Sequence, residues 1–248
     1  MSRPQTREFP DLESLVSAAA EDLVGCIERF MGEGGRCRVA VAGGSTPRPV
    51  YRLVAGPELA SRIAWERVDV FWGDERWVPP TDPASNYRMV QEELLARVPI
   101  PPANVHRVEI AGSPEEAAEV YARQIGDQPL DLVLLGMGGD GHTASLFPDT
   151  PGLGTHAGRA IATTAPSEPS QRISLTLRTI NEAGAVRFWV AGSAKAQRVA
   201  EVFEQIEGGM PLLPAARVQP QSGRLCWFVD AGAAQELRSR PGGDQSDG

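Results

Sequence analysis

The chain has 248 residues, of which 42% are apolar, and its 24 basic and 32 acidic residues give a formal net charge of −8. This length and composition suit a globular α/β protein of one large domain or two small ones. The acidic balance argues against a nucleic-acid-binding surface, which needs clustered lysines and arginines. It leaves room for a small phosphorylated ligand, because a few cations in one pocket are enough to bind a phosphate.

The chain has 3 cysteines, an odd number, and no CxxC pair. This argues against a disulfide framework and a zinc site and is typical of a reducing cytosol. The first residues, "MSRPQTREFPDLES", lack the apolar core of a signal peptide, and no apolar run approaches the roughly 18 residues of a membrane span. The histidines form neither HxH nor HExxH, so we expect no metal site. We therefore expect a cytoplasmic protein.

Apolar periodicity and capping residues predict alternating helices and strands in the first half of the chain. Between Leu12 and Phe30, apolar residues recur at helical spacing, with Asp11 as the N-cap and Gly34–Gly35 as the end. The elements that follow are a buried strand over 37–42, a helix with Thr46 as cap and Pro47 in its first turn, a strand over 68–73, and a helix over 86–98 capped by Asn86.

The second half continues this alternation. Ser113 and Glu116 have capping-box spacing at the start of a predicted helix over 113–125. The stretch "DLVLLGMGG" (131–139) is the most apolar of the predicted strands. Further strands are predicted over 160–164, 172–177, 186–191 and 225–229, with a helix over 194–206 between the last two.

This order of elements predicts an α/β fold with a mostly parallel, Rossmann-like sheet flanked by helices. We expect a single domain over 1–237, and a small subdomain after Pro148 is the alternative. The last residues, 238–248, read "RSRPGGDQSDG". They are polar and glycine-rich, so a disordered tail is expected.

The stretch "LGMGGDGHTASLFPD" (135–149) contains a GxGxxG pattern after a predicted strand. Gly136, Gly138 and Gly141 have the spacing of a dinucleotide-binding loop, so an NAD(P)-dependent oxidoreductase is one hypothesis. That fingerprint needs an acidic residue about 20 residues further on, at the end of the next strand. The next strand here, "AIATTAP", has none, and the motif lies near the middle of the chain, so that one complete nucleotide-binding half cannot precede it. The cofactor hypothesis is therefore weak.

Polar loops follow several of the predicted strands, and in an open α/β sheet such loops face a common crevice. "GGSTP" (43–47) at a helix start is typical of an anion site, and equally of a plain helix cap. "GDERWVPP" (73–80) places three charges at a strand end. His142 follows the glycine loop, where its imidazole would act as a general base or merely pack locally. Arg172 and Lys195 are either surface charges or the cations that a phosphate needs.

Six motifs, taken in their order, resemble those of the 6-phosphogluconolactonase family. They are "GGSTP", "GDERWVP", "SNY", "GMGGDGHTASLFP", "RISLT" and "AGSAKA", and the resemblance covers about residues 10 to 235. It implies a fold similar to those of glucosamine-6-phosphate deaminase and ribose-5-phosphate isomerase. It also implies hydrolysis of 6-phospho-D-glucono-1,5-lactone to 6-phosphogluconate, the second step of the oxidative pentose phosphate pathway, without a metal or an organic cofactor.

The same resemblance implies roles for the residues that match these motifs. His142 matches the proposed general base, Asp140 matches the acidic residue beside it, and Asp74 matches a further active-site residue. We expect Asp140 to orient His142. The positions that match the substrate and phosphate contacts are Gly43, Gly44, Ser45, Thr46, Arg76, Arg172 and Lys195. The expected partner is a small sugar-phosphate lactone, with no nucleic acid or membrane, and the expected state is a monomer.

Two alternatives stay open. A deaminase-like sugar-phosphate isomerase would share the "DGH" stretch, but those enzymes carry a glutamate a few residues beyond the histidine, where this chain reads "SLFP" (145–148). A sugar-phosphate-binding protein without catalytic activity would keep the phosphate cations and lose the base. The presence of both Asp74 and His142 argues against that reading.

Overall fold

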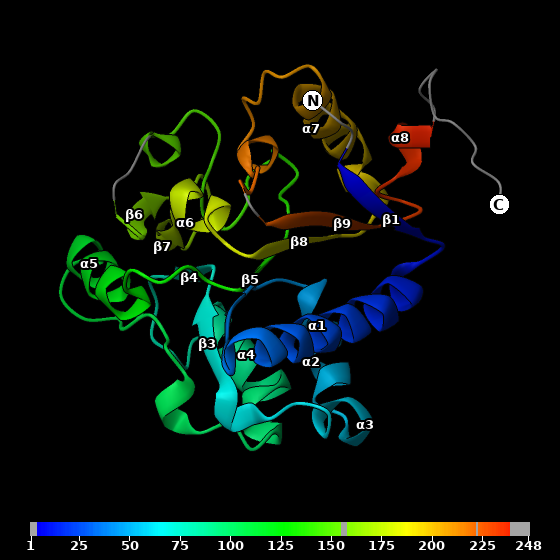
Figure 1. Ribbon diagram of the computed structural model, residues 1–248. Coiled ribbons are helices and arrows are strands. Elements are labelled where there is room, and N and C mark those ends of the chain that lie inside the picture. The colour runs from blue at the N-terminus through cyan, green and yellow to red at the C-terminus, as the bar shows by residue number, and fades with distance from the viewer. Residues whose placement is uncertain (1–3, 155–157, 222, 239–248) are drawn as a thin grey trace.

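The computed structural model describes residues 4–154, 158–221 and 223–238. Its main feature is a six-stranded parallel sheet in the order β1-β9-β8-β5-β2-β3, with helices on both faces (Figure 1). This confirms the predicted α/β fold with a mostly parallel sheet. The strands of this sheet are β1 (Gln5–Phe9), β2 (Cys37–Val41), β3 (Val68–Trp72), β5 (Leu132–Leu135), β8 (Ala185–Val190) and β9 (Arg224–Asp230).

The helices largely follow the predicted pattern. They are α1 (Leu12–Gly34), α2 (Pro47–Val54), α3 (Pro57–Ala60), α4 (Asn86–Glu93), α5 (Pro114–Ile125), α6 (Leu177–Asn181), α7 (Ala196–Glu207) and α8 (Gln235–Arg238). Asp11 caps α1, and the predicted capping box of Ser113 and Glu116 is present. The prediction that Asn86 caps its helix is wrong, because Ser85 accepts the hydrogen bond from the Arg88 amide and Asn86 is the first helical residue.

Each central strand contributes to two apolar cores, one on each face of the sheet. In β5, Leu132 and Leu134 pack in the core that includes α1, α2 and α4, whereas Val133 and Leu135 pack in the core that includes α5 and α7. Successive side chains of a strand point to opposite faces, so a strand covered on both sides needs an unbroken apolar run. The run "LVLL" meets that requirement, and all four of its residues are buried.

A second, three-stranded sheet lies beside the first, in the order β4-β7-β6. It consists of β4 (Asp74–Arg76), β6 (Ala160–Thr164) and β7 (Gln171–Leu175), and its pairs are antiparallel. The strands β6 and β7 confirm the prediction, but β4 was expected to be a loop. Its three residues are all charged, so no apolar alternation marks them as a strand. The single domain and the alternative of a subdomain after Pro148 both stay predictions.

The edge strand β1 was not predicted from the sequence. It pairs only with β9 in the sheet order, and its five residues are exposed or half-buried. A short polar edge strand buries no complete face, so its sequence lacks the pattern by which strands are recognised. At the other end of the chain, α8 extends to Arg238, the first residue of the predicted tail. The rest of that tail lies outside the described residues.

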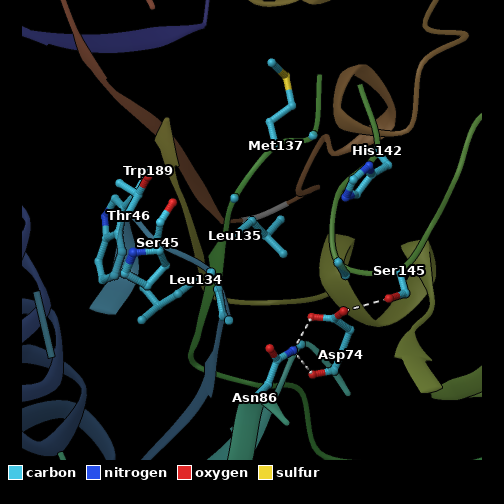
Figure 2. A pocket seen from close by; sticks show the side chains of 18 of the residues that line it. Ser45, Thr46, Asp74, Asn86, Leu134, Leu135, Met137, His142, Ser145 and Trp189 are labelled. Atoms are coloured by element: carbon cyan, nitrogen blue, oxygen red, sulfur yellow. Dashed lines mark hydrogen bonds between the residues drawn. The ribbon is translucent and has the colours of Figure 1, made fainter. Parts of the chain in front are cut away.

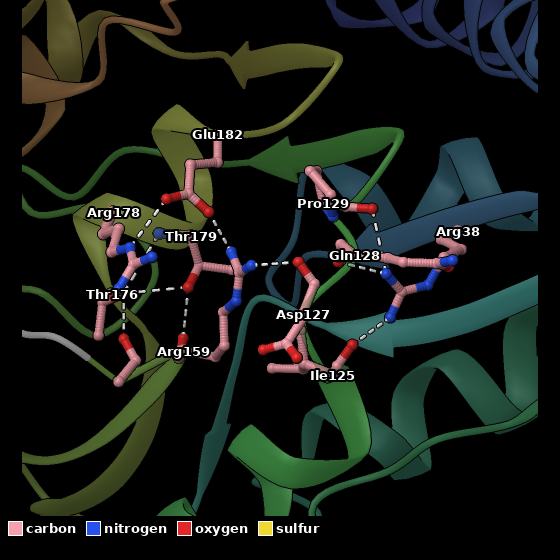
Figure 3. Close-up of polar contacts among 11 residues, drawn as sticks. Arg38, Ile125, Asp127, Gln128, Pro129, Arg159, Thr176, Arg178, Thr179 and Glu182 are labelled. Atoms are coloured by element: carbon pink, nitrogen blue, oxygen red, sulfur yellow. Dashed lines mark hydrogen bonds and ion pairs between the residues drawn. The ribbon is translucent and has the colours of Figure 1, made fainter.

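Arg38 near the start of β2 and Arg159 just before β6 illustrate how guanidinium groups are bound in this fold (Figure 3). Arg38 donates to the carbonyl oxygens of Ile125, Gln128 and Pro129, and so holds the connection from α5 to β5. Arg159 donates to Glu182 and to the carbonyl oxygen of Asp127. Both guanidinium groups thus bind protein acceptors through their Nη atoms and stabilise local structure. Over the described residues, no helix combines the length and the apolar character needed to span a bilayer.

Candidate active site

A cavity opens at the carboxyl ends of β2, β3, β5 and β8. After β2, the next strand of the sheet, β3, is added on one side, whereas the strands that follow β5, namely β8 and β9, are added on the other. The strand order therefore reverses between β2 and β5. Open α/β sheets bind ligands at such a point. The cavity measures about 350 Å³, a size that suits a small molecule. All predicted site residues except Asp140 line it, namely Gly43, Gly44, Ser45, Thr46, Asp74, Arg76, His142, Arg172 and Lys195.

His142 and Asp140 form a hydrogen-bonded pair at one wall of the cavity. The Nδ1 atom of His142 lies 2.6 Å from Oδ1 of Asp140, and the backbone amide of His142 donates to the same oxygen at 3.1 Å. The ring of Phe147 packs against the imidazole, with the ring centroids 4.6 Å apart. A carboxylate beside Nδ1 favours the tautomer in which Nδ1 carries the proton. That leaves Nε2 as the nitrogen able to accept a proton.

The pKa of Asp140 is lowered by its contacts with His142. Burial is the largest single influence and raises this pKa. The hydrogen bonds from the backbone amide and the ring of His142, together with the charge of His142, outweigh it. Asp140 itself does not line the cavity. It contacts the Nδ1 side of His142, a position suited to orienting the ring.

Gly138, the second glycine of the GxGxxG pattern, makes room for this pair. A Cβ atom at this position would lie 2.1 Å from Cε1 and Nδ1 of His142 and 2.6 Å from Oδ1 of Asp140. Any larger residue would therefore displace the imidazole. Gly138 therefore lets the His142 side chain approach the backbone of this loop closely. In a dinucleotide-binding loop, the corresponding glycine would instead let the backbone approach the pyrophosphate.

Asp74 faces the cavity between two walls. Figure 2 shows Ser45 and Thr46 on one side, His142 and Ser145 on the other, and Asp74 between them. The hydroxyl of Ser145 donates to Oδ2 of Asp74 at 2.6 Å. Ser145 is buried and comes from the histidine motif, so this contact ties that loop to the "GDER" strand.

Arg76 and Arg172 are cross-strand partners in the β4–β7 pair. The Nε atoms of both are buried and have no hydrogen-bond partner within the described part of the chain. Arg172 is only 7% exposed. Burial, followed by the charge of Arg76, lowers its pKa. Arg76 donates through Nη1 to the carbonyl oxygen of Ala84 at 2.6 Å. The two adjacent guanidinium groups still keep buried Nε donors, which a bound anion could satisfy.

Further groups suited to an anion also line the cavity. Gly43 to Thr46 lead into α2, and Lys195 follows β8 in a short 3-10 helix, η5 (Ser193–Lys195). Thr46 occupies the N-cap position of α2, but its side chain makes no capping hydrogen bond, so that part of the prediction is wrong. The hydroxyl of Thr46 therefore has no role in holding the helix start, and backbone amides at the helix N-terminus favour a negative charge.

Glu75, the central acidic residue of "GDER", has a structural role. It is 3% exposed, and its carboxylate accepts from the Ser85 hydroxyl and from the amides of Arg76, Asn86 and Tyr87. Burial raises its pKa, although these backbone donors oppose the shift. The residue ties β4 to the start of α4. From the sequence, Glu75 was grouped with Asp74 and Arg76, because a sequence does not show which side of a three-residue strand faces a cavity.

The cavity lining also includes residues that were missing from the predicted site, among them the polar residues Asn86 and Ser145. Both belong to quoted motifs, "SNY" and the histidine motif, but neither motif reveals which side chain turns inward. Among the described residues, no group of three or more histidine, cysteine or acidic side chains is arranged to hold a metal ion.

Comparison with known proteins identifies the family. Residues 10–227 match the model of the glucosamine-6-phosphate isomerase/6-phosphogluconolactonase family. The chain belongs to this family. It is 37% identical over 245 residues to the 6-phosphogluconolactonase of Synechocystis sp., covering 95% of this chain and 99% of that protein.

Solved structures extend the comparison. The crystal structure of 6-phosphogluconolactonase from Thermotoga maritima has a TM-score of 0.80 at 33% identity, covering 92% of this chain and 100% of that one. A monomeric glucosamine-6-phosphate deaminase has a TM-score of 0.79 at 20% identity, covering 94% of this chain and 99% of that one, a likeness of fold alone. These relatives confirm the family and the enzyme type expected from the six ordered motifs.

Proposed function

We propose that this protein hydrolyses 6-phospho-D-glucono-1,5-lactone to 6-phospho-D-gluconate, with His142 as the general base. The observation that carries the proposal is one cavity that combines two features. The Nδ1 atom of His142 is held by Asp140, which leaves Nε2 for proton transfer, and buried Nε donors of Arg76 and Arg172 await an acceptor. A base and an anion site in the same small cavity suit a neutral reacting group attached to a phosphate.

In the proposed reaction, water attacks the C1 carbonyl of the lactone while Nε2 of His142 takes one of its protons. The tetrahedral oxyanion then collapses, and the bond between C1 and the ring oxygen breaks. His142 returns its proton to the ring oxygen, which becomes a hydroxyl, and the new carboxylic acid releases a proton to solvent. General-base catalysis of this kind supplies a factor of about 10²–10⁴ in rate.

The phosphate would serve as the binding handle. Arg172, Arg76 and Lys195 would bind it, with the Gly43–Thr46 loop closing the other side of the cavity. Binding energy from a part of the substrate that does not react can be used to hold the reacting carbonyl near the base. We expect a lactone without the phosphate to react much more slowly for this reason.

The test follows proton release after the lactone is generated in situ by enzymatic oxidation of glucose 6-phosphate. The wild type should accelerate its decay, and His142→Ala should lose about 10²–10⁴-fold in kcat. His106→Ala is a matched control, because His106 also pairs with an aspartate and stacks on a phenylalanine but does not line the cavity. Decay that the wild type does not accelerate would contradict the lactonase proposal. Equal losses in the two variants would contradict the role of His142.

The rival activities have direct tests as well. The wall beside His142 is the apolar ring of Phe147, which cannot exchange protons as a carboxylate does, and this favours hydrolysis over deamination. Ammonia release from glucosamine 6-phosphate would favour the deaminase alternative, and binding of NAD(P) would favour the oxidoreductase. A cytoplasmic location, a monomeric state and the absence of a cofactor stay predictions.

A further inference from the structure

The "SNY" motif is the one ordered motif to which the proposed chemistry assigns no role. It spans residues 85–87 at the start of α4. Ser85 caps the helix, and Asn86 is its first residue. The side chain of Asn86 nevertheless turns away from the helix and into the lining of the cavity, and the residue is only 3% exposed (Figure 2). A buried amide in a cavity wall needs a partner or a task.

The partner of Asn86 is Asp74. The Nδ2 atom of Asn86 donates to the backbone oxygen of Asp74 at 2.9 Å and to its Oδ1 atom at 3.2 Å. Oδ2 of the same carboxylate accepts from the Ser145 hydroxyl at 2.6 Å. Each carboxylate oxygen therefore has one protein donor, and both the plane and the rotation of the group are held.

Asn86 also contacts the loop on the far side of Asp74. A Cβ atom at Gly43 would lie 1.9 Å from Oδ1 of Asn86, so the amide packs directly against the backbone of that loop. The backbone amide of Asn86 is itself anchored, because it donates to the buried Glu75 carboxylate at 2.8 Å. The Asn86 side chain thus lies between Gly43, which follows β2, and Asp74, which follows β3. Its backbone is held in place by Glu75.

We propose that Asn86 is a positioning residue that acts through Asp74. Asp74, held by Asn86 and Ser145, accepts a hydrogen bond from a hydroxyl of the sugar ring and so fixes the lactone relative to His142. A carboxylate is an acceptor only, and a ring hydroxyl is the donor that a sugar substrate presents to it. This inference rests on the proposed function. It adds a task for "SNY" and a substrate contact for Asp74.

The experiment is a double-mutant cycle on kcat and KM for the lactone, using wild type, Asn86→Ala, Asp74→Ala and the double variant. Asn86→Ala should lower kcat/KM about 10- to 100-fold, since small misplacements in an active site cost up to about 10² in rate. In the Asp74→Ala background, the same substitution should cost less than about twofold. Groups that act as a unit give such non-additive losses.

Asn104→Ala is the matched control, because Asn104 is also a buried asparagine whose Nδ2 donates to a backbone oxygen, that of Glu66 at 3.0 Å, outside the cavity lining. It should lower thermal stability by a similar amount and leave kcat/KM unchanged. If Asn86→Ala does not fold, Asn86→Ser takes its place in the cycle, since its side chain is too short to span to Asp74.

Two results would overturn the proposal: an Asn86→Ala loss that is equally large in the Asp74→Ala background, or a loss no greater than that of Asn104→Ala. A wild type that does not hydrolyse the lactone would instead contradict the proposed function. The cycle would then be repeated on the affinity for 6-phosphogluconate, measured by calorimetry, with the same non-additivity expected.

Discussion

Within the described part of the chain, two histidine–aspartate pairs make similar immediate contacts, each with an aromatic ring against the imidazole. His142 pairs with Asp140 and packs on Phe147, with ring centroids 4.6 Å apart. His106 pairs with Asp69 at 3.1 Å and stacks on an aromatic ring 4.5 Å away. The histidine side chains are also similarly exposed, 33% for His142 and 29% for His106. A pair of this kind is therefore no mark of a catalytic site by itself.

The two pairs differ in what surrounds them. Asp69 is shared with Arg36, whose Nη2 lies 2.8 Å from its other oxygen, so that the carboxylate belongs to a surface ion pair. His106 lies beside β3 and lines no part of the cavity. His142, in contrast, faces a cavity that contains Arg76 and Arg172. The comparison indicates that access to a bound substrate, rather than the pair, makes a histidine a base.

The largest difference in kcat between the two pairs is expected when the aspartate of each pair, Asp140 or Asp69, is changed to asparagine. Asp140→Asn should lower kcat by about 10² or more, because an amide no longer enforces the Nδ1–H tautomer of His142. Asp69→Asn should leave kcat unchanged. Steady-state kinetics on the lactone measures both. Similar losses in the two variants would show that the pairs do not differ as proposed.

A smaller effect on kcat is expected from Gly138→Ala, which leaves both His142 and Asp140 in the chain. The added methyl would lie 2.1 Å from Cε1 of His142 and would displace the ring. We expect kcat to fall about 10- to 100-fold with little change in KM, because the substrate contacts remain. Gly25→Ala, in α1, is the control, since its added methyl meets no atom within 4 Å. An unchanged kcat in Gly138→Ala would mean that the position of His142 does not limit the reaction.

The smallest expected effect is on stability as a function of pH. The folded state lowers the pKa of Asp140 below its ordinary value of 3.8, so its contribution to stability is present above that pH and is lost as the pH falls through the lower folded value. The wild type should therefore lose its advantage over Asp140→Asn on acidification from about pH 6 to about pH 3. Because Asp140 is 41% exposed, the advantage should stay below about 1 kcal/mol. Urea unfolding at each pH measures it, and an advantage that grows in acid would contradict this sign.

Much of the fold was predictable because its signals are local. The buried run "LVLL", the capping box of Ser113 and Glu116, and the Asp11 cap each depend on residues within a few positions of one another. The histidine motif is local too, since Asp140, His142 and Phe147 are neighbours in the chain. The sequence alone therefore determined the alternation of elements and the composition of the His142–Asp140 pair.

The tertiary structure decided what depends on distant segments. Arg76 and Arg172 become partners only when β4 and β7 pair, and "GDER" becomes a strand only because β7 lies beside it. The same holds for Asn86 against Gly43 and for Ser145 against Asp74, contacts that join the ends of different strands. No local pattern encodes which side of a short charged strand turns inward, because that depends on the surface it meets. The sequence therefore predicted nine of the residues that line this cavity. The packing of the two sheets gave Glu75 a structural role and placed Asn86 in the cavity wall.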